Sequence, residues 1–294
     1  MYATIARLGE EEFDGDLLID SFIRLGACQR QIGVLADAEA SYVTAGKIAK
    51  RRKDTRRVFR SQIGIGLLTG ARGNLPKADD LLAQVVVECE LMGCAEEHAR
   101  ALHARSVVAQ QRGDLGRSVC LAYDALQRTS APSERDLILA DIGGFLIVMR
   151  RFDAARDALM ILEATAATEL PRLQARVNLV VLAARAGDRD LFTHSRARLE
   201  NVTLQPAVKV NYLIESARGF RAFGESDRAE VLLNDARDLA SEHGFNRSIF
   251  EIEEMLAKRE VGMETTSGNV RFEDSEAAAG VERELRQMAL AVAE

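Results

Sequence analysis

Apolar residues recur at helical spacing in pairs of segments that are separated by a short turn. In residues 18–31, apolar side chains at i, i+4, i+7 and i+10 would share one face of a helix. Gly33 follows this segment, and glycine can adopt the positive φ that ends a helix. The next apolar stripe consists of Leu35, Ala38, Tyr42 and Ala45. The pattern predicts two paired helices joined by a tight turn.

The same pair of segments recurs along most of the chain. A turn residue returns every 37 to 40 positions, at Gly33, Gly73, Gly113, Arg150, Gly187 and Gly224. The small residues Ala38, Ala78 and Ala229 are expected to be buried where paired helices cross. Gly93 and Gly244 lie 20 residues beyond a turn glycine and mark the predicted end of a second helix. A period of this size is typical of a solenoid, so we predict an all-α array of about six helix-turn-helix repeats.

The predicted solenoid spans residues 15–260, and segments of different character flank it. We interpret residues 1–14 as an N-terminal cap or as the remnant of a preceding repeat. Residues 261–276 are polar and without helical periodicity, which predicts a flexible linker. Residues 277–294 predict a short amphipathic helix, whose apolar stripe is Val281, Leu285, Met288 and Val292. We expect residues 281–292 either to dock on the array, as a cap of the last unit or in its groove, or to form a disordered tail.

Composition and motifs favour a helical protein without chemistry of its own. Of the 294 residues 47% are hydrophobic, Trp is absent and Pro occurs four times. The four cysteines form no CxxC pair and the four histidines show no ligand spacing with them, so we expect neither a metal nor a cofactor. No nucleophile motif and no HExxH is present, so we expect no enzyme. Without a secretory signal or a membrane-spanning apolar run, we expect a cytoplasmic protein that does not bind membranes.

Several of these residues match the positions of a known repeat. Leu25, Gly26, Ala38, Tyr42 and Ala45 fall at the offsets of the tetratricopeptide pattern. The chain resembles tetratricopeptide repeat (TPR) proteins of the long, 37–42-residue kind, although the usual Trp and Pro are missing. The resemblance implies a right-handed α-α superhelix that binds a protein or peptide. Because such arrays form part of many bacterial helix-turn-helix regulators and signalling ATPases, it also implies a scaffold or sensor in a bacterial regulatory system.

The resemblance further implies which side chains line a concave groove. In the family, the second, fifth, ninth, twelfth and thirteenth residues of each first helix point into it. Asp20 is the only acid at the corresponding positions, which favours an acidic, amphipathic protein segment as the ligand. The alternative is that the arginine stems only cover apolar helix surface. The candidate groove residues are Arg30, Gln31, Arg60, Arg100, His103, Gln110, Gln111, Ile147, Arg185, Arg218 and Arg221.

The densest charge feature lies in residues 47–60, with eight basic residues and one acid. Such a stripe suits nucleic acid, which is our alternative function, although the net charge of −6 argues against general nucleic-acid binding. The stripe is also explained as a solvated turn whose cations lie near a helix C-terminus. The candidate patch residues are Lys47, Lys50, Arg51, Arg52, Lys53, Arg56 and Arg57.

Overall fold

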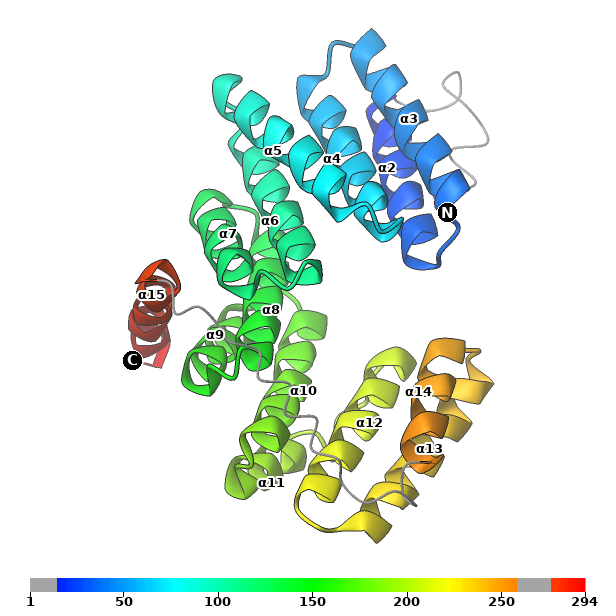
Figure 1. The fold of residues 1–294 in the computed structure, drawn as a ribbon, viewed down its shortest axis with the longest axis vertical. Helices are drawn as coiled ribbons and strands as arrows, with labels where there is room; N and C mark the ends of the chain where they lie inside the picture. Colours follow the sequence, from blue (N-terminus) through cyan, green and yellow to red (C-terminus); the bar gives the residue numbers. More distant parts are fainter. Residues whose placement is uncertain (1–14, 258–275, 294) are drawn as a thin grey trace. The chain divides into compact units, whose positions relative to one another are not determined.

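The computed structural model describes residues 15–257 and 276–293, and within these ranges the regular structure is helical throughout (Figure 1). The helices are α2 (Gly15–Gln31), α3 (Leu35–Arg51), α4 (Thr55–Ala71), α5 (Leu75–Leu91), α6 (Ala95–Gln111), α7 (Leu115–Arg128), α8 (Pro132–Val148), α9 (Phe152–Thr165), α10 (Glu169–Ala186), α11 (Arg189–Ala197), α12 (Pro206–Ala222), α13 (Ser226–Glu242), α14 (Asn246–Ala257) and α15 (Glu276–Ala293). From α2–α3 to α12–α13 they follow one another as six helix pairs. The all-α helix-turn-helix prediction is confirmed.

Residues with positive φ close the helix pairs, as the sequence predicts. All six predicted turn positions have φ between 60° and 86°, including the non-glycine residue Arg150. The Gly33 and Val34 amides donate to the carbonyls of Arg30 and Gln29, which is the Schellman arrangement that satisfies the last carbonyls of a helix. Gly93 and Gly244 also have positive φ, and so does Lys53, which sequence reasoning missed. Lys53 lies 20 residues beyond Gly33, so the repeat spacing already marked this position.

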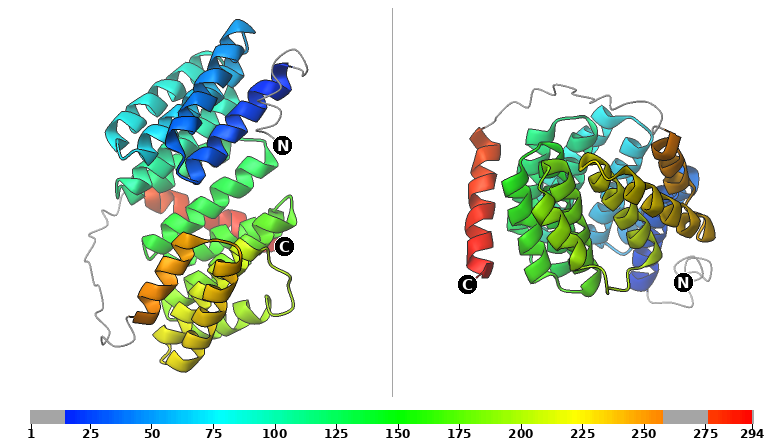
Figure 2. Two further views of the ribbon diagram at one scale, coloured as in Figure 1. Left: turned by 90° about the vertical axis from the view of Figure 1, so that its right-hand side faces the viewer. Right: turned by 90° about the horizontal axis from the view of Figure 1, so that it is seen from below.

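The chain divides into two compact units, Met1–Ile138 and Leu139–Glu294, with the boundary inside α8. Small residues set the close helix approaches in both. Ala38, Ala78 and Ala229 are fully buried, as predicted. In the C-terminal unit α12, α13 and α14 pack in sequence order, and their core includes Leu233, Ala236 and Ile252 (Figure 2).

Two aromatic side chains fill the spaces that neighbouring glycines leave open. Tyr42 of α3 is buried against Gly26 of α2 and Gly64 of α4, and a Cβ atom on Gly64 would lie 2.3 Å from the Tyr42 ring. In the C-terminal unit a Cβ atom on Gly219 would lie 2.2 Å from the Phe192 ring. The helix carrying the glycine therefore approaches the aromatic ring more closely than any other residue type would allow.

The ends of the chain give a mixed outcome. The predicted cap or remnant at residues 1–14 and the predicted linker, apart from residue 276, lie outside the described residues. The predicted C-terminal helix is present as α15, which contacts α9 (Figure 2). This position differs from both expected docking sites, since α9 is neither the last helix of the array nor the first helix of a pair. None of the described helices is both long and apolar enough to cross a membrane.

We predict that Gly64→Ala destabilises the protein by about 1–3 kcal/mol, because the new methyl group collides with the Tyr42 ring. Gly144→Ala is the matched control, since Gly144 also lies inside a helix but has nothing within 4 Å of an added Cβ atom. This control should be neutral or stabilising by up to about 1 kcal/mol, through helix propensity alone. Urea unfolding of both variants measures the difference, and equal effects would refute the role of the Gly64 contact.

Candidate functional site

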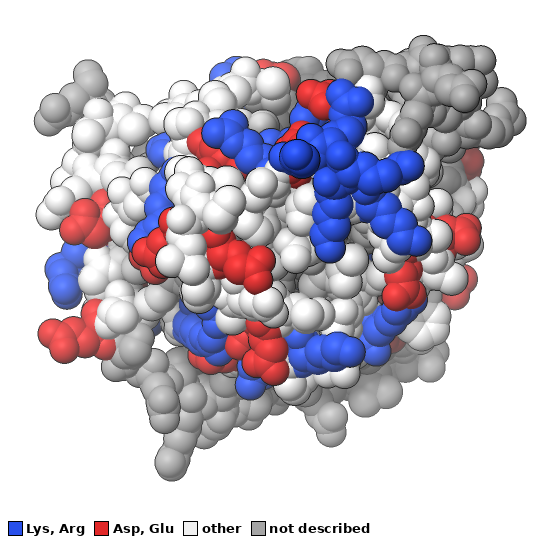
Figure 3. All heavy atoms as spheres, turned by 90° about the horizontal axis from the view of Figure 1, so that it is seen from above, with Lys and Arg blue, Asp and Glu red and all other residues white. Residues whose placement is uncertain are grey.

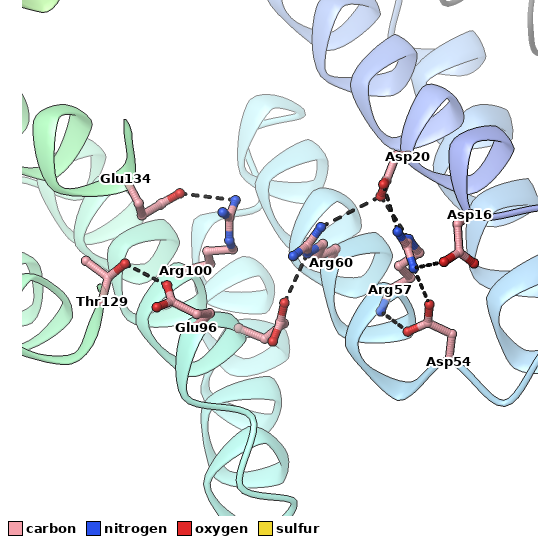
Figure 4. A network of polar contacts seen from close by, with 10 residues as sticks. Asp16, Asp20, Asp54, Arg57, Arg60, Glu96, Arg100, Thr129 and Glu134 are labelled. Carbon is pink, nitrogen blue, oxygen red and sulfur yellow. Dashed lines mark hydrogen bonds and ion pairs between the residues drawn. The ribbon is translucent and has the colours of Figure 1, made fainter. Parts of the chain in front are cut away.

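Two of the predicted groove arginines of the N-terminal unit, Arg60 and Arg100, pair with carboxylates of neighbouring repeats (Figure 4). Arg60 of α4 places its Nε 3.0 Å from Oε1 of Glu97 on α6, and its Nη1 lies 3.7 Å from Oδ1 of Asp20 on α2. Glu97 is almost completely buried. Arg60 thus bridges the first helices of three consecutive pairs.

Arg57 makes a similar connection one turn earlier in α4. Its guanidinium contacts both carboxylate oxygens of Asp20 at 3.0 and 2.9 Å, and it also pairs with Asp16 and Asp54 (Figure 4). Hydrogen bonding to Asp20 raises the pKa of Arg57 although partial burial opposes this. Arg57 was predicted as part of the basic patch, but three aspartates already engage its charge.

A buried polar cluster connects α6 to the beginning of α8. Arg100 lies 3.1 Å from Oε2 of Glu134, and Nδ1 of His103 lies 3.4 Å from Oε1 of the same carboxylate. His103 and Glu134 are both buried. Burial raises the pKa of Glu134, but the hydrogen bond with His103 and the charge of Arg100 outweigh burial and leave the pKa below its usual value. The cluster therefore holds an ionised glutamate between two helices.

Glu96, next to Glu97, fixes the connection between α7 and α8 in the same region. Its carboxylate accepts hydrogen bonds from the Thr129 hydroxyl at 2.7 Å and from the Ser130 amide at 2.8 Å. Burial raises the pKa of Glu96, but the hydrogen bonds from Ser130 and Thr129 outweigh burial, so the pKa lies below its usual value. The carboxylate thus satisfies polar groups of the loop that leads into the next repeat.

The C-terminal unit repeats this use of arginine. Arg218 of α12 pairs with Glu215 on its own helix and lies 2.6 Å from Glu251 on α14. Arg221 donates a hydrogen bond to the Met255 carbonyl at 2.7 Å. Both residues were predicted to face a ligand, and in the structure both connect α12 to α14.

These pairs change the basis of the groove prediction. The partner acids Glu97 and Glu134 lie one helical turn before the first groove position of their helices. The scarcity of acids at the groove positions therefore does not extend to the neighbouring turn of each helix. The sequence signal for Glu97 is the repeat spacing itself, since Arg60 and Glu97 are 37 residues apart, as are Asp20 and Arg57. The positive charge that favoured an acidic ligand is consequently reduced.

The remaining predicted groove residues differ in their exposure. His103 and Ile147 are buried, whereas Arg30 and Gln110 are half-buried. Gln31, Gln111 and Arg185 are exposed, and their side chains are accessible to a partner. That these residues line a binding groove stays a prediction.

The predicted basic patch is largely at the surface. Figure 3 shows a cluster of Lys and Arg side chains on the face where the turn between α3 and α4 lies. Since Arg57 is engaged by its aspartates, the exposed members are Lys47, Lys50, Arg51, Arg52, Lys53 and Arg56. This is a surface to which an anionic partner has direct access.

The Cys89 thiol is poorly reactive, and metal-ligating side chains are not grouped within the described residues. Cys89 is fully buried, and burial raises the pKa of its thiol to about 12, so the reactive thiolate is scarce at neutral pH. Across residues 15–257 and 276–293, no three His, Cys, Asp or Glu side chains are grouped so as to hold a metal ion.

We predict that Arg60→Ala destabilises the protein by about 2–4 kcal/mol, because it removes the ion-pair partner of the buried Glu97 carboxylate. Arg72→Ala is the matched control, because Arg72 pairs with Glu39 at the exposed surface, where solvent screens the interaction. Denaturant unfolding should show little change for this control. An equal loss in both variants would mean that burial of Glu97 does not matter.

We also predict that Glu134→Gln reduces the acid sensitivity of the protein. Because the folded-state pKa of Glu134 is lowered, its contribution is present above the usual glutamate pKa and is lost as the pH falls through the folded-state value. The variant should therefore be less stable at pH 7 and should approach the wild type in acid. Unfolding midpoints measured from pH 7 downward test this, and a constant difference at every pH would contradict it.

Comparisons with known proteins agree with this architecture. A tetratricopeptide repeat protein from Parabacteroides merdae is similar with a TM-score of 0.52 at 13% identity, covering 92% of this chain and 98% of that one. Two other structures are similar at 16% identity: a putative kinesin light chain with TPR-like repeats from Podosopora anserina (TM-score 0.41, 79% and 98% covered) and BtubC (BKLC) from P. vanneervenii (TM-score 0.45, 83% and 88% covered). No protein-family model and no curated protein sequence matches the chain. At such low identity the likeness concerns the fold alone, and the fold of this chain is that of the tetratricopeptide repeat proteins.

Proposed function

We propose that this chain is a non-catalytic protein-binding scaffold or sensor module, and that it acts in a bacterial regulatory system in the cytoplasm. The observation that carries the proposal is the row of first helices in the N-terminal unit, where α2, α4 and α6 lie in contact and ion pairs join them. Arrays of this kind present extended binding surfaces built from several repeats. Because this row is fixed before a partner arrives, binding would need little ordering of the surface.

An acidic, amphipathic protein segment is the partner that we propose. Exposed Gln31 and Gln111, each the last residue of a first helix, offer hydrogen bonds without the desolvation that a charged pair requires. The exposed cations between Lys47 and Arg56 add a positive potential in the same unit, which accelerates the approach of an acidic chain. The four cysteines are free, which fits a reducing compartment.

We predict that a Gln31→Glu/Gln111→Glu variant binds an acidic amphipathic peptide roughly three- to ten-fold more weakly than the wild type, through charge repulsion at the proposed surface. Gln127→Glu is the matched control, since Gln127 is exposed near the end of α7, which is a second helix. Fluorescence anisotropy with a labelled Glu- and Leu-rich helical peptide gives the affinities. The groove assignment fails if the control weakens binding as much as the double variant does.

The exposed basic patch supports a second candidate function, nucleic-acid binding. The same anisotropy measurement with a labelled DNA duplex distinguishes the two, because phosphate contacts make log K fall steeply with log salt concentration, by about 0.9 per contact. Lys50→Glu and Arg56→Glu should each flatten that slope. Absence of duplex binding at low salt would remove this candidate and leave the protein-binding proposal standing.

A further inference from the structure

The helix α15 covers one side of α9, although more than a hundred residues separate them in sequence (Figures 1 and 2). Its buried stripe consists of Ala278, Val281, Leu285 and Ala289. The predicted stripe matches this in part, since Val281 and Leu285 are buried whereas Val292 is exposed. The contacts thus use one narrow apolar face of the helix.

The side of α9 that receives α15 differs from the corresponding side of another second helix. Ala154, Ala158 and Ile161 are buried. Ala154 lines the cleft between α9 and α15, and the spacing of i, i+4 and i+7 puts the other two on the same side of the helix. In α5, which has the same place in its pair, the equivalent residues are Lys77, Leu81 and Gln84, and none of them is buried. An outer face this apolar needs a cover, and the alanines allow a helix to approach closely.

Charged side chains fix how α15 lies on this face. The Asp157 carboxylate is buried, and its Oδ1 accepts a hydrogen bond from Nη1 of Arg286 at 3.1 Å. Arg151 and Glu282 form a second pair at 3.5 Å. In one pair α15 supplies the cation, and in the other it supplies the anion. This arrangement favours one register and direction of the helix, because reversing α15 would separate both pairs.

The packing between the two helices is incomplete. A cleft of about 850 Å³ runs along the contact, lined by charged residues that include Asp153, Arg156 and Arg283. Among the described residues, α9 is the helix that α15 contacts substantially. A helix that packs on a single neighbour beside an open polar cleft is held by few interactions, so another helix can displace it.

We propose that the outer face of α9 is a docking site for an amphipathic helix that carries an arginine opposite Asp157, and that α15 is its built-in, displaceable occupant. Residues 258–275 tether α15, so its effective concentration at α9 is on the order of millimolar. A helix from a partner protein binds there only when it displaces α15. This site is separate from the proposed peptide-binding row of first helices, so the failure of one proposal leaves the other intact.

A peptide with the sequence of residues 276–293 is the probe, labelled for fluorescence anisotropy and added to the full-length chain. Leu285→Asp in the chain frees the face of α9, because it places a charge in the buried stripe. We expect the peptide to bind this variant at least ten-fold more tightly than the wild type, in which tethered α15 competes. Hydrogen exchange should show faster exchange in α15 of the variant and unchanged protection in α9 and α10, which excludes unfolding.

Charge exchange then tests the register. The peptide carrying Arg286→Asp should bind the Leu285→Asp chain at least ten-fold more weakly, and adding Asp157→Arg to that chain should restore its binding. Glu284→Arg in the peptide is the matched control and should change the affinity less than two-fold, since Glu284 is exposed on the same helix and does not line the cleft. Equal binding to the wild-type and Leu285→Asp chains, or no restoration by Asp157→Arg, would overturn the proposal. So would a wild-type dimer in light scattering that Arg286→Asp dissociates, because α15 would then be exchanged between two copies.

Discussion

Ion pairs between arginine and carboxylate across neighbouring repeats are the interaction on which the order of this array depends. A helix pair buries only part of its surface by itself, so each pair has to be held against the next one. Hydrophobic contacts supply most of the energy, but they are non-directional and tolerate sliding of one helix along another. The Arg60–Glu97 and Arg57–Asp20 pairs allow little sliding, because their geometry is satisfied at one register only. Burial of Glu97 strengthens this constraint, since any shift that leaves its carboxylate unpaired is unfavourable.

This constraint explains why part of the molecule was predictable from sequence and part was not. The turns were predictable because positive φ is a local requirement, which Gly33 and Gly73 meet directly and which the repeat register assigns to Arg150. The close helix approaches were also visible, through small residues such as Ala78 at a fixed offset. The partners of the arginines were not, since Glu97 and Glu134 act across a repeat boundary and only the relative register of two helices brings them into contact. A search for arginine and acid at the repeat distance would have found the Arg60–Glu97 pair.

The same pairs separate structural charge from charge available for binding. Arg60, Arg100 and Arg218 carry positive charges that neighbouring carboxylates compensate. Other positive charges of the N-terminal unit lie at the surface, in exposed cations such as Lys50 and Arg56 at the turn between α3 and α4 (Figure 3). Long-range attraction of an acidic partner would therefore originate at this turn, whereas the row of first helices would contribute shape and uncharged polar contacts.

The location of α15 was unpredictable for a related reason. Its sequence shows an apolar stripe but not the surface that the stripe covers, and the receiving side of α9 is recognisable only by comparing it with an equivalent helix such as α5. There Lys77 and Gln84 occupy the places of Ala154 and Ile161, so α5 has no second apolar side. A second helix with two apolar sides carries one more contact surface than the array itself uses. Since first helices form the row proposed for peptide binding, a ligand on that row and a helix on α9 would contact different elements of the chain.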